Sequence, residues 1–131
     1  MNRVSATLSV WCEKLRPERI AQILNVNPDR VVIKGSERTP PRPRPTAFGW
    51  HLTVVETDQP LAGKVLKSLI DRASISENRF HELRIEDSTT TINFSIHIAP
   101  RSTDISLFFD RGAIEFISSV GGCLDIEFFD L

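Results

Sequence analysis

The stretch INFSIHI, residues 92–98, gives the clearest indication of how this chain of 131 residues folds. Its apolar residues, Ile92, Phe94, Ile96 and Ile98, alternate with Asn93, Ser95 and His97. A period of two is that of a β-strand, in which successive side chains point to opposite faces of a sheet. We therefore expect a strand with one buried and one polar face, which is typical of an antiparallel sheet covered on one side.

Similar alternation on either side of this stretch predicts the other main strands. It occurs in residues 4–10, residues 48–56 and residues 123–129. A short extended piece is expected at residues 30–33. The apolar residues within 80–85 predict a further strand, which a turn at residues 87–89 reverses into residues 92–98 as a hairpin.

Two helices are predicted, one in the first half of the chain and one near its middle. Pro17 suits a first helical turn, and Glu18 favours the positive end of the helix dipole. The buried stripe of this helix is expected to be Ile20, Ile23 and Leu24. Residues 25–29 end it, because the residue before a proline is pushed out of the helical region. A second helix follows the start signals at residues 57–60, with apolar residues at helical spacing through residues 62–73.

A third helix is predicted near the C-terminus. Asp110 can cap a helix that runs from Arg111 to Val120, and Gly121-Gly122 can close it. Residues 105–109 are then extended, and the last strand is residues 123–129.

These elements predict an α+β fold in one domain over residues 1–131. The helices can cover one face of a mainly antiparallel sheet. Each half of the chain can form a split βαβ unit, so a ferredoxin-like arrangement is expected. An Arg/Pro-rich loop interrupts the pattern at about residues 34–47.

Composition narrows the class of protein. Hydrophobic residues make up 40% and charged residues 25% of the chain, as in soluble globular proteins. No apolar run is long enough to cross a bilayer, and residues 1–5 lack the apolar core of a signal peptide, so a cytoplasmic protein is expected. Cys12 and Cys123 lie far apart without CxxC spacing, so we expect them reduced and buried, in neither a disulfide nor a zinc site.

Charge is distributed unevenly along the chain. Although the formal net charge is −1, residues 1–50 hold nine basic residues against four acidic ones, and residues 51–131 hold seven against thirteen. Such a split indicates either a basic face for a partner or two ends of one fold that bring opposite charges together.

The Arg/Pro loop is the strongest candidate for contact with another molecule. It interleaves Pro40, Pro41, Pro43 and Pro45 with Arg38, Arg42 and Arg44. Arginines on a stiff segment lose little entropy on binding and can pair with carboxylates or phosphates. The partner-binding residues predicted from this pattern are Lys34, Arg38, Arg42, Arg44, Trp50 and His51. A solvated linker is the alternative.

Other residues that carry chemistry are better explained as structural. His51, His81 and His97 fall in predicted strands without metal-ligand spacing. Cys12 has no readable base beside it. Lys34-Gly35-Ser36 reverses the order of a phosphate loop, so Gly35 is expected to serve a backbone turn.

The carboxylates near the C-terminus follow the same logic. Asp125, Glu127 and Asp130 form a row on the last strand that could hold a divalent ion with Glu115, but acidic residues also protect a strand edge from pairing. We predict no catalytic residue, no metal and no cofactor.

Several landmarks in order resemble one family. They are Leu15-Arg16-Pro17-Glu18-Arg19-Ile20, Leu24 with Pro28 and Arg30, Lys34-Gly35, Gly49-Trp50, and Val120-Gly121-Gly122 before Leu124-Asp125-Ile126-Glu127-Phe128. In this order and spacing the chain resembles the bacterial family called domain of unknown function 4279. The resemblance implies a small cytoplasmic domain and supplies no reaction. The Pro-Arg run of residues 39–45 is not part of that pattern, so a function placed there would be peculiar to this protein.

Three function hypotheses follow. The first is a non-enzymatic module that binds another protein in a regulatory or toxin-neutralising immunity setting, because acidic strands and a basic loop suit electrostatic recognition. The second is a nucleic-acid-binding accessory protein that uses the basic first half, with affinity that falls steeply with salt. The third is an enzyme or small-ligand binder with a pocket near Lys34 and Trp50. The oligomeric state is left open.

Overall fold

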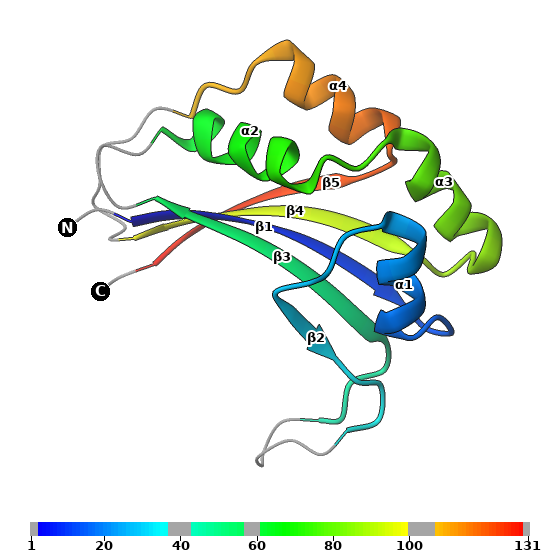
Figure 1. Ribbon diagram of the computed structural model, residues 1–131. Helices are drawn as coiled ribbons and strands as arrows, with labels where there is room; N and C mark the ends of the chain where they lie inside the picture. Colours follow the sequence, from blue (N-terminus) through cyan, green and yellow to red (C-terminus); the bar gives the residue numbers. More distant parts are fainter. Residues whose placement is uncertain (1–2, 37–42, 57–60, 100–106, 130–131) are drawn as a thin grey trace.

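The computed structural model describes residues 3–36, 43–56, 61–99 and 107–129. Within these residues the chain forms five strands and four helices. In chain order they are β1 (Arg3–Cys12), α1 (Pro17–Leu24), β2 (Arg30–Val32), β3 (Phe48–Glu56), α2 (Ala62–Ala73), α3 (Glu77–Glu86), β4 (Thr91–Ala99), α4 (Arg111–Ser119) and β5 (Cys123–Phe128). The helices lie on one side of the sheet (Figure 1).

The strands form one sheet in the order β2-β3-β1-β4-β5. The pairs β2–β3, β3–β1 and β1–β4 are antiparallel, whereas β4 and β5 are parallel. Parallel neighbours need a crossover connection, and α4 lies in this one. The predicted α+β class with a mainly antiparallel sheet is confirmed.

Alternating side chains divide the sheet into a core face and a second face. The predicted apolar side of residues 92–98 is buried, as are the apolar positions of β1 and β3, and together they form the core with the helices. Trp50 and Leu52 of β3 lie on this side, whereas His51 and Thr53 lie on the other. Among the described residues, no helix covers the second face of the sheet.

The predicted helix ends are confirmed where the structure describes them. Pro17 begins α1, and Asn25 ends it in the left-handed region at φ 58°. At the start of α4, Asp110 Oδ1 accepts a hydrogen bond from the Ala113 N–H at 2.8 Å. Gly121 follows α4 with φ 68°. The apolar stripe predicted for α1 is buried.

The strand predicted at residues 80–85 is wrong, and with it the hairpin. These residues belong to α3. Phe80 and Leu83 lie three residues apart and face the core, whereas Ile85 is 84% exposed. So short a segment fits the period of a strand and that of a helix equally well, and only packing against the core separates them.

Asp87 joins the end of α3 to the connection between β1 and α1. Its almost fully buried carboxylate accepts hydrogen bonds from the N–H groups of Lys14 at 2.9 Å and Leu15 at 3.1 Å. It also accepts one from the Thr89 N–H at 2.9 Å. Burial raises the pKa of Asp87, but the hydrogen bonds from Thr89, Lys14 and Leu15 outweigh it and lower the pKa to about 2.

Arginine side chains connect other elements. Arg72 of α2 donates to both carboxylate oxygens of Asp29, each at 2.9 Å. Arg84 of α3 donates to the carbonyls of Val120 and Gly121 at the end of α4. These contacts fix α2 relative to the segment that leads into β2, and α3 relative to the segment that leads into β5.

Several predictions fall partly outside the described residues. These are the middle of the Arg/Pro loop, at residues 37–42, the helix start signals at residues 57–60, and residues 105–106 of the predicted extended segment. Gly35 has φ 75°, which confirms the predicted backbone turn. In the described part of the chain, the helices are too short or too polar to cross a membrane.

Candidate functional site

The second face of the sheet is the first candidate site, because no helix of the described residues lies on it (Figure 1). The strand registers place on it Arg30 and Val32 of β2; His51, Thr53 and Val55 of β3; Arg3, Ser5, Thr7, Ser9 and Trp11 of β1; Thr91, Asn93, Ser95 and His97 of β4; and Cys123, Asp125 and Glu127 of β5. Most of these side chains are short and polar. We call this surface the open face.

Hydrogen bonds between neighbouring strands fix several of these side chains. The hydroxyls of Thr7 and Thr53 lie 3.0 Å apart. Asn93 Nδ2 donates to Ser95 Oγ at 2.9 Å and to Asp125 Oδ2 at 3.3 Å. Side chains that are already held lose less entropy when a partner binds.

His51 lies near the middle of the β2–β3–β1 part of the open face and is 2% exposed. Its Nδ1 is 2.8 Å from Ser9 Oγ, and its ring packs edge-on against Trp11, with ring centroids 4.9 Å apart. Gly49 leaves room for both rings, because a Cβ there would lie 2.8 Å from His51 Nε2 and from Trp11. Burial, helped by the charge of Arg30, lowers the pKa of His51 to about 4. The imidazole is therefore neutral at pH 7.

A serine hydroxyl hydrogen-bonded to a histidine is also the arrangement of an activated nucleophile. In such sites a third group orients the histidine through its other nitrogen. His51 Nε2 is buried and makes no hydrogen bond with the part of the chain that the structure describes. A pKa of about 4 also makes His51 a weak general base at neutral pH. The Ser9–His51 pair is better explained as a structural contact of the open face.

The two edges of the open face carry opposite charges. Arg30 lies on β2, in register with His51 of β3. Asp125 and Glu127 lie on β5, in register with Ser95 and His97 of β4. The two edges therefore carry opposite charges, and Arg3 of β1 adds one cation between them at one end of the sheet.

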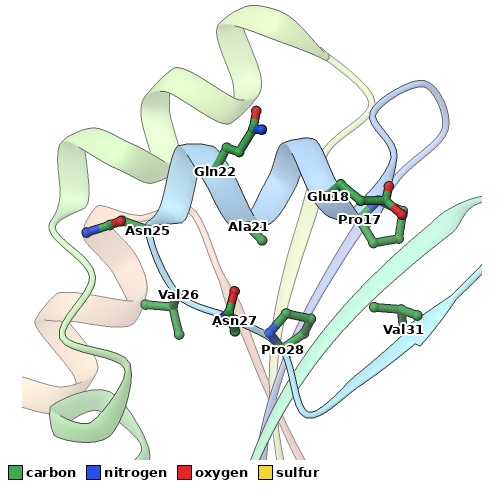
Figure 2. A pocket seen from close by; sticks show the side chains of 9 residues that line it. All are labelled: Pro17, Glu18, Ala21, Gln22, Asn25, Val26, Asn27, Pro28 and Val31. Atoms are coloured by element: carbon green, nitrogen blue, oxygen red, sulfur yellow. The ribbon is translucent and has the colours of Figure 1, made fainter.

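The second candidate site is a groove on the helical side, between α1 and β2 (Figure 2). Its volume is about 520 Å³, and it is lined by Pro17, Glu18, Ala21, Gln22, Asn25, Val26, Asn27, Pro28 and Val31. In Figure 2, Ala21 on the underside of α1 faces the loop that carries Val26 and Pro28. We call it the α1–β2 groove. It combines an apolar lining with amide groups and one carboxylate.

Of the six site residues that the sequence predicts, the structure describes Lys34, Arg44, Trp50 and His51, and it places Lys34 near Arg44 but Trp50 and His51 on opposite faces of the sheet. Lys34 Nζ donates to the Glu13 carbonyl at 2.9 Å, and Arg44 lies 3.5 Å from the Gly35 carbonyl. Trp50 is fully buried in the core, where its indole N–H donates to the Val26 carbonyl at 3.3 Å. His51 is buried on the opposite face. Arg38 and Arg42 lie outside the described residues, and the role of all six in binding stays a prediction.

The cysteines and carboxylates make no metal site in the described part of the chain. Cys12 is buried, with Sγ 3.2 Å from Thr90 Oγ1, and burial raises the pKa of its thiol. Cys123 is exposed, so the prediction that both cysteines are buried is wrong for this residue. It occupies the outward position at the start of the edge strand β5. Glu115 pairs with Arg111 on α4 at 2.7 Å, and Asp130 lies outside the described residues.

The histidines outside β3 also have structural contacts. His81 lies on α3 rather than in a strand, with Nε2 3.2 Å from Glu77 Oε1. His97 Nε2 is 3.9 Å from Glu127 Oε2 on the open face. The three histidines therefore come from different parts of the fold and do not form one cluster.

The importance of Arg30 and of the α1–β2 groove is missed by sequence reasoning. Alternation within residues 30–33 predicts an extended piece, but not that it pairs with β3 or that Arg30 shares a face with His51. Those facts depend on a register between segments about 20 residues apart, which pattern alone does not encode. The groove has no sequence signal, because it forms where α1 passes over β2.

The fold and these surfaces define an α+β domain with helices on one face of a mixed five-stranded sheet and a polar open face. The model of the family described as domain of unknown function (DUF4279) matches residues 2–130. The chain therefore belongs to this family, as the resemblance of its landmarks implies. Searches of curated proteins and of solved structures each found no match.

Proposed function

We propose that this domain is a cytoplasmic bacterial protein-binding module of a regulatory or immunity type, and that its partner contacts the open face. The observation that carries the proposal is a sheet face without a helix whose two edges have opposite charges. Interfaces between separate proteins are polar at the rim and tolerate many hydrogen-bonding side chains. Opposite charges at the two edges would orient the partner and set its register.

The charge pattern favours a protein over a nucleic acid. A phosphate backbone is attracted to Arg30 but repelled by Asp125 and Glu127 on the same face. A protein surface can match both signs at once. The proposed partner therefore carries an acidic patch opposite β2 and a basic patch opposite β5.

The Arg/Pro loop extends the basic edge in this proposal. It connects β2 to β3, so its ends are fixed beside Arg30. Lys34 and Arg44 add cationic groups at that edge, and Arg38 and Arg42 lie between them in the sequence. Trp50 and His51 support the surface from within the sheet, and the partner need not touch either ring.

We also infer that β1 to β4 form a ferredoxin-like arrangement with β5 added at one edge. The strand order supports this inference, because β3 lies between β1 and β2, and β1 lies between β3 and β4. A ferredoxin-like arrangement consists of two split βαβ units, each with a helix in its connection. The helices then share one face and leave the other free for a partner.

A capture experiment with matched variants tests the proposed function. The full chain, tagged, is incubated with lysate of its native host, with and without nuclease. Ser5→Arg places a large cation on the open face, whereas Ser68→Arg places the same group on the exposed side of α2. We expect Ser5→Arg to retain about tenfold less partner and Ser68→Arg to retain the wild-type amount, because a misplaced charge in a contact surface is costly.

The same capture tests the loop. Replacement of Arg38, Arg42 and Arg44 by Ser should weaken the partner contact without lowering the unfolding midpoint. Equal capture by Ser5→Arg and Ser68→Arg would contradict the open-face proposal. Capture that nuclease abolishes, with affinity that falls steeply with salt, would replace it with the nucleic-acid alternative.

A further inference from the structure

β2 is an edge strand that lies beside the α1–β2 groove. It pairs with β3 through three residues, and it stands first in the strand order, so its outer side faces no other strand of the described residues. The unpaired side of an edge strand presents backbone N–H and C=O groups. An extended segment of another chain can bind these groups by adding a strand to the sheet.

The groove runs along this same edge on the helical side. Val31 of β2 is 44% exposed and lines the groove together with Ala21 of α1. Pro17, Val26 and Pro28 add further apolar surface (Figure 2). A volume of about 520 Å³ accommodates an aliphatic side chain with space for its flanking backbone.

The geometry of a sheet decides where the side chains of an added strand point. Residues opposite one another on neighbouring strands share a face. A peptide residue opposite Val31 therefore points into the groove. Its two neighbours lie opposite Arg30 and Val32, which belong to the other face of the sheet.

Charge distinguishes the two sides of such a strand. Arg30 is exposed and makes no hydrogen bond or ion pair with the described residues, so an acidic residue beside it gains a charge partner. In the groove, Glu18 is the one charged residue among the described lining residues, and it disfavours a carboxylate there. A shift of one residue would place the acid beside Glu18 and the apolar side chain beside Arg30, so the charges also fix the register.

We propose that the β2 edge and the α1–β2 groove bind an extended peptide segment of another protein, with an aliphatic residue in the groove and an acidic residue beside Arg30. This inference goes beyond the proposed function, because it uses the edge and the groove rather than the open face. The two surfaces share Arg30, whereas Val31 and the groove belong to this proposal alone.

The test is an NMR titration of the ¹⁵N-labelled full chain with two synthetic peptides. Acetyl-Thr-Asp-Leu-Asp-Thr-amide places Leu opposite Val31 and Asp opposite Arg30 in either strand direction. Acetyl-Thr-Asn-Leu-Asn-Thr-amide replaces both carboxylates by amides of the same shape, so it keeps the aliphatic residue and lacks a charge partner for Arg30. We expect the first peptide to bind about fivefold more tightly and to shift amide signals of α1 and β2, since a cross-strand charge pair is worth up to about 1 kcal/mol.

Variants separate this contact from nonspecific attraction. Arg30→Glu should bind the Asp-Leu-Asp peptide about fivefold more weakly and acetyl-Thr-Lys-Leu-Lys-Thr-amide about fivefold more tightly than wild type does. Arg111→Glu changes an exposed arginine on α4 by the same charge and should alter neither affinity. Ala21→Leu fills the groove and should weaken binding of the Asp-Leu-Asp peptide.

Three results would overturn the proposal. The first is equal affinity for the Asp-Leu-Asp and Asn-Leu-Asn peptides. The second is the absence of binding by both. The third is a set of shifted amide signals that lies in β4 and β5 instead of α1 and β2. None of these results bears on capture of a partner by the open face, so the two proposals fail separately.

Discussion

At His51, which lies on the polar face of the sheet, burial rather than an ion pair determines the pKa of the side chain. It faces the side of the sheet without helices, yet Trp11 and the backbone of Gly49 enclose its ring. Burial is the larger cause of its lowered pKa, and the positive charge of Arg30 adds to it. His51 therefore belongs to the framework of the open face rather than to its set of charges.

The protonation of His51 makes a prediction about stability. Its pKa is about 4 in the folded chain and near the ordinary 6.5 in the unfolded chain. As pH falls below about 6.5, the unfolded state takes up this proton first, so the free energy of unfolding decreases until about pH 4. His51→Gln keeps a partner for Ser9 but cannot be protonated, so its stability should change less over this range. Urea unfolding at pH steps from about 7 to about 4 measures the difference.

Ser68→Gln is the control for this experiment. Ser68 is exposed on α2 and carries no titratable group, so this variant should keep the pH dependence of the wild type. A His51→Gln variant whose stability falls as steeply as that of the wild type would show that the histidine is not held neutral.

At the scale of the elements, local patterns predicted most strands and helices, and packing decided the rest. The alternation in residues 92–98 and in residues 48–56 identifies strands because each segment is long enough to show its period. Residues 80–85 are too few to show a clear period, so the sequence predicts a strand where the chain forms α3. The order β2-β3-β1-β4-β5 depends on contacts between distant segments, which no local pattern reveals.

The candidate site was less predictable than the fold for the same reason. The faces of Trp50 and His51 follow from alternation, and their opposite directions in the sheet are as predicted. Burial of both rings depends on what packs against each face, which the sequence of β3 does not contain. The pairing of Ser9 with His51 and the position of Arg30 beside them both need the strand register.

Asp87 makes a prediction at the scale of elements, because it connects α3, the start of β4 and the β1–α1 connection. Asp87→Asn removes the charge and replaces one of the two acceptor oxygens by an NH₂ group, which then faces either the N–H groups of Lys14 and Leu15 or the N–H of Thr89. We expect a loss of about 2 kcal/mol in the free energy of unfolding at pH 7. Chemical denaturation measures it, with Asp71→Asn on the exposed side of α2 as the matched control.

The pH dependence of Asp87 has a defined sign. Its folded pKa of about 2 lies below the ordinary 3.8, so its contribution is complete above about pH 4 and is lost as the pH falls toward 2. Asp87→Asn should lack this acid-sensitive part of the stability. An Asp87→Asn variant as stable as Asp71→Asn would contradict the connecting role.

At the scale of the whole molecule, the described helices pack on one face of the sheet, which forms the core, and not on the other, which is the open face. The apolar side chains of β1, β3 and β4 are buried in the core beneath the helices. The side chains at the alternate positions lie on the open face, and charged side chains lie at both of its edges. Part of the charge difference between the two halves of the sequence therefore appears on one sheet. Arg30, from the basic half, lies near one edge, and Asp125 and Glu127, from the acidic half, lie near the other.

Hydroxyl-radical footprinting of the free chain and of the chain bound to its captured partner tests the central claim most directly. Trp11 and His97 lie on the open face, whereas Ile85 is 84% exposed on α3. The account predicts that the partner slows oxidation of Trp11 and His97 and leaves the rate at Ile85 unchanged. Protection of Ile85 with unchanged oxidation of Trp11 and His97 would contradict it, because the partner would then lie on the helical side.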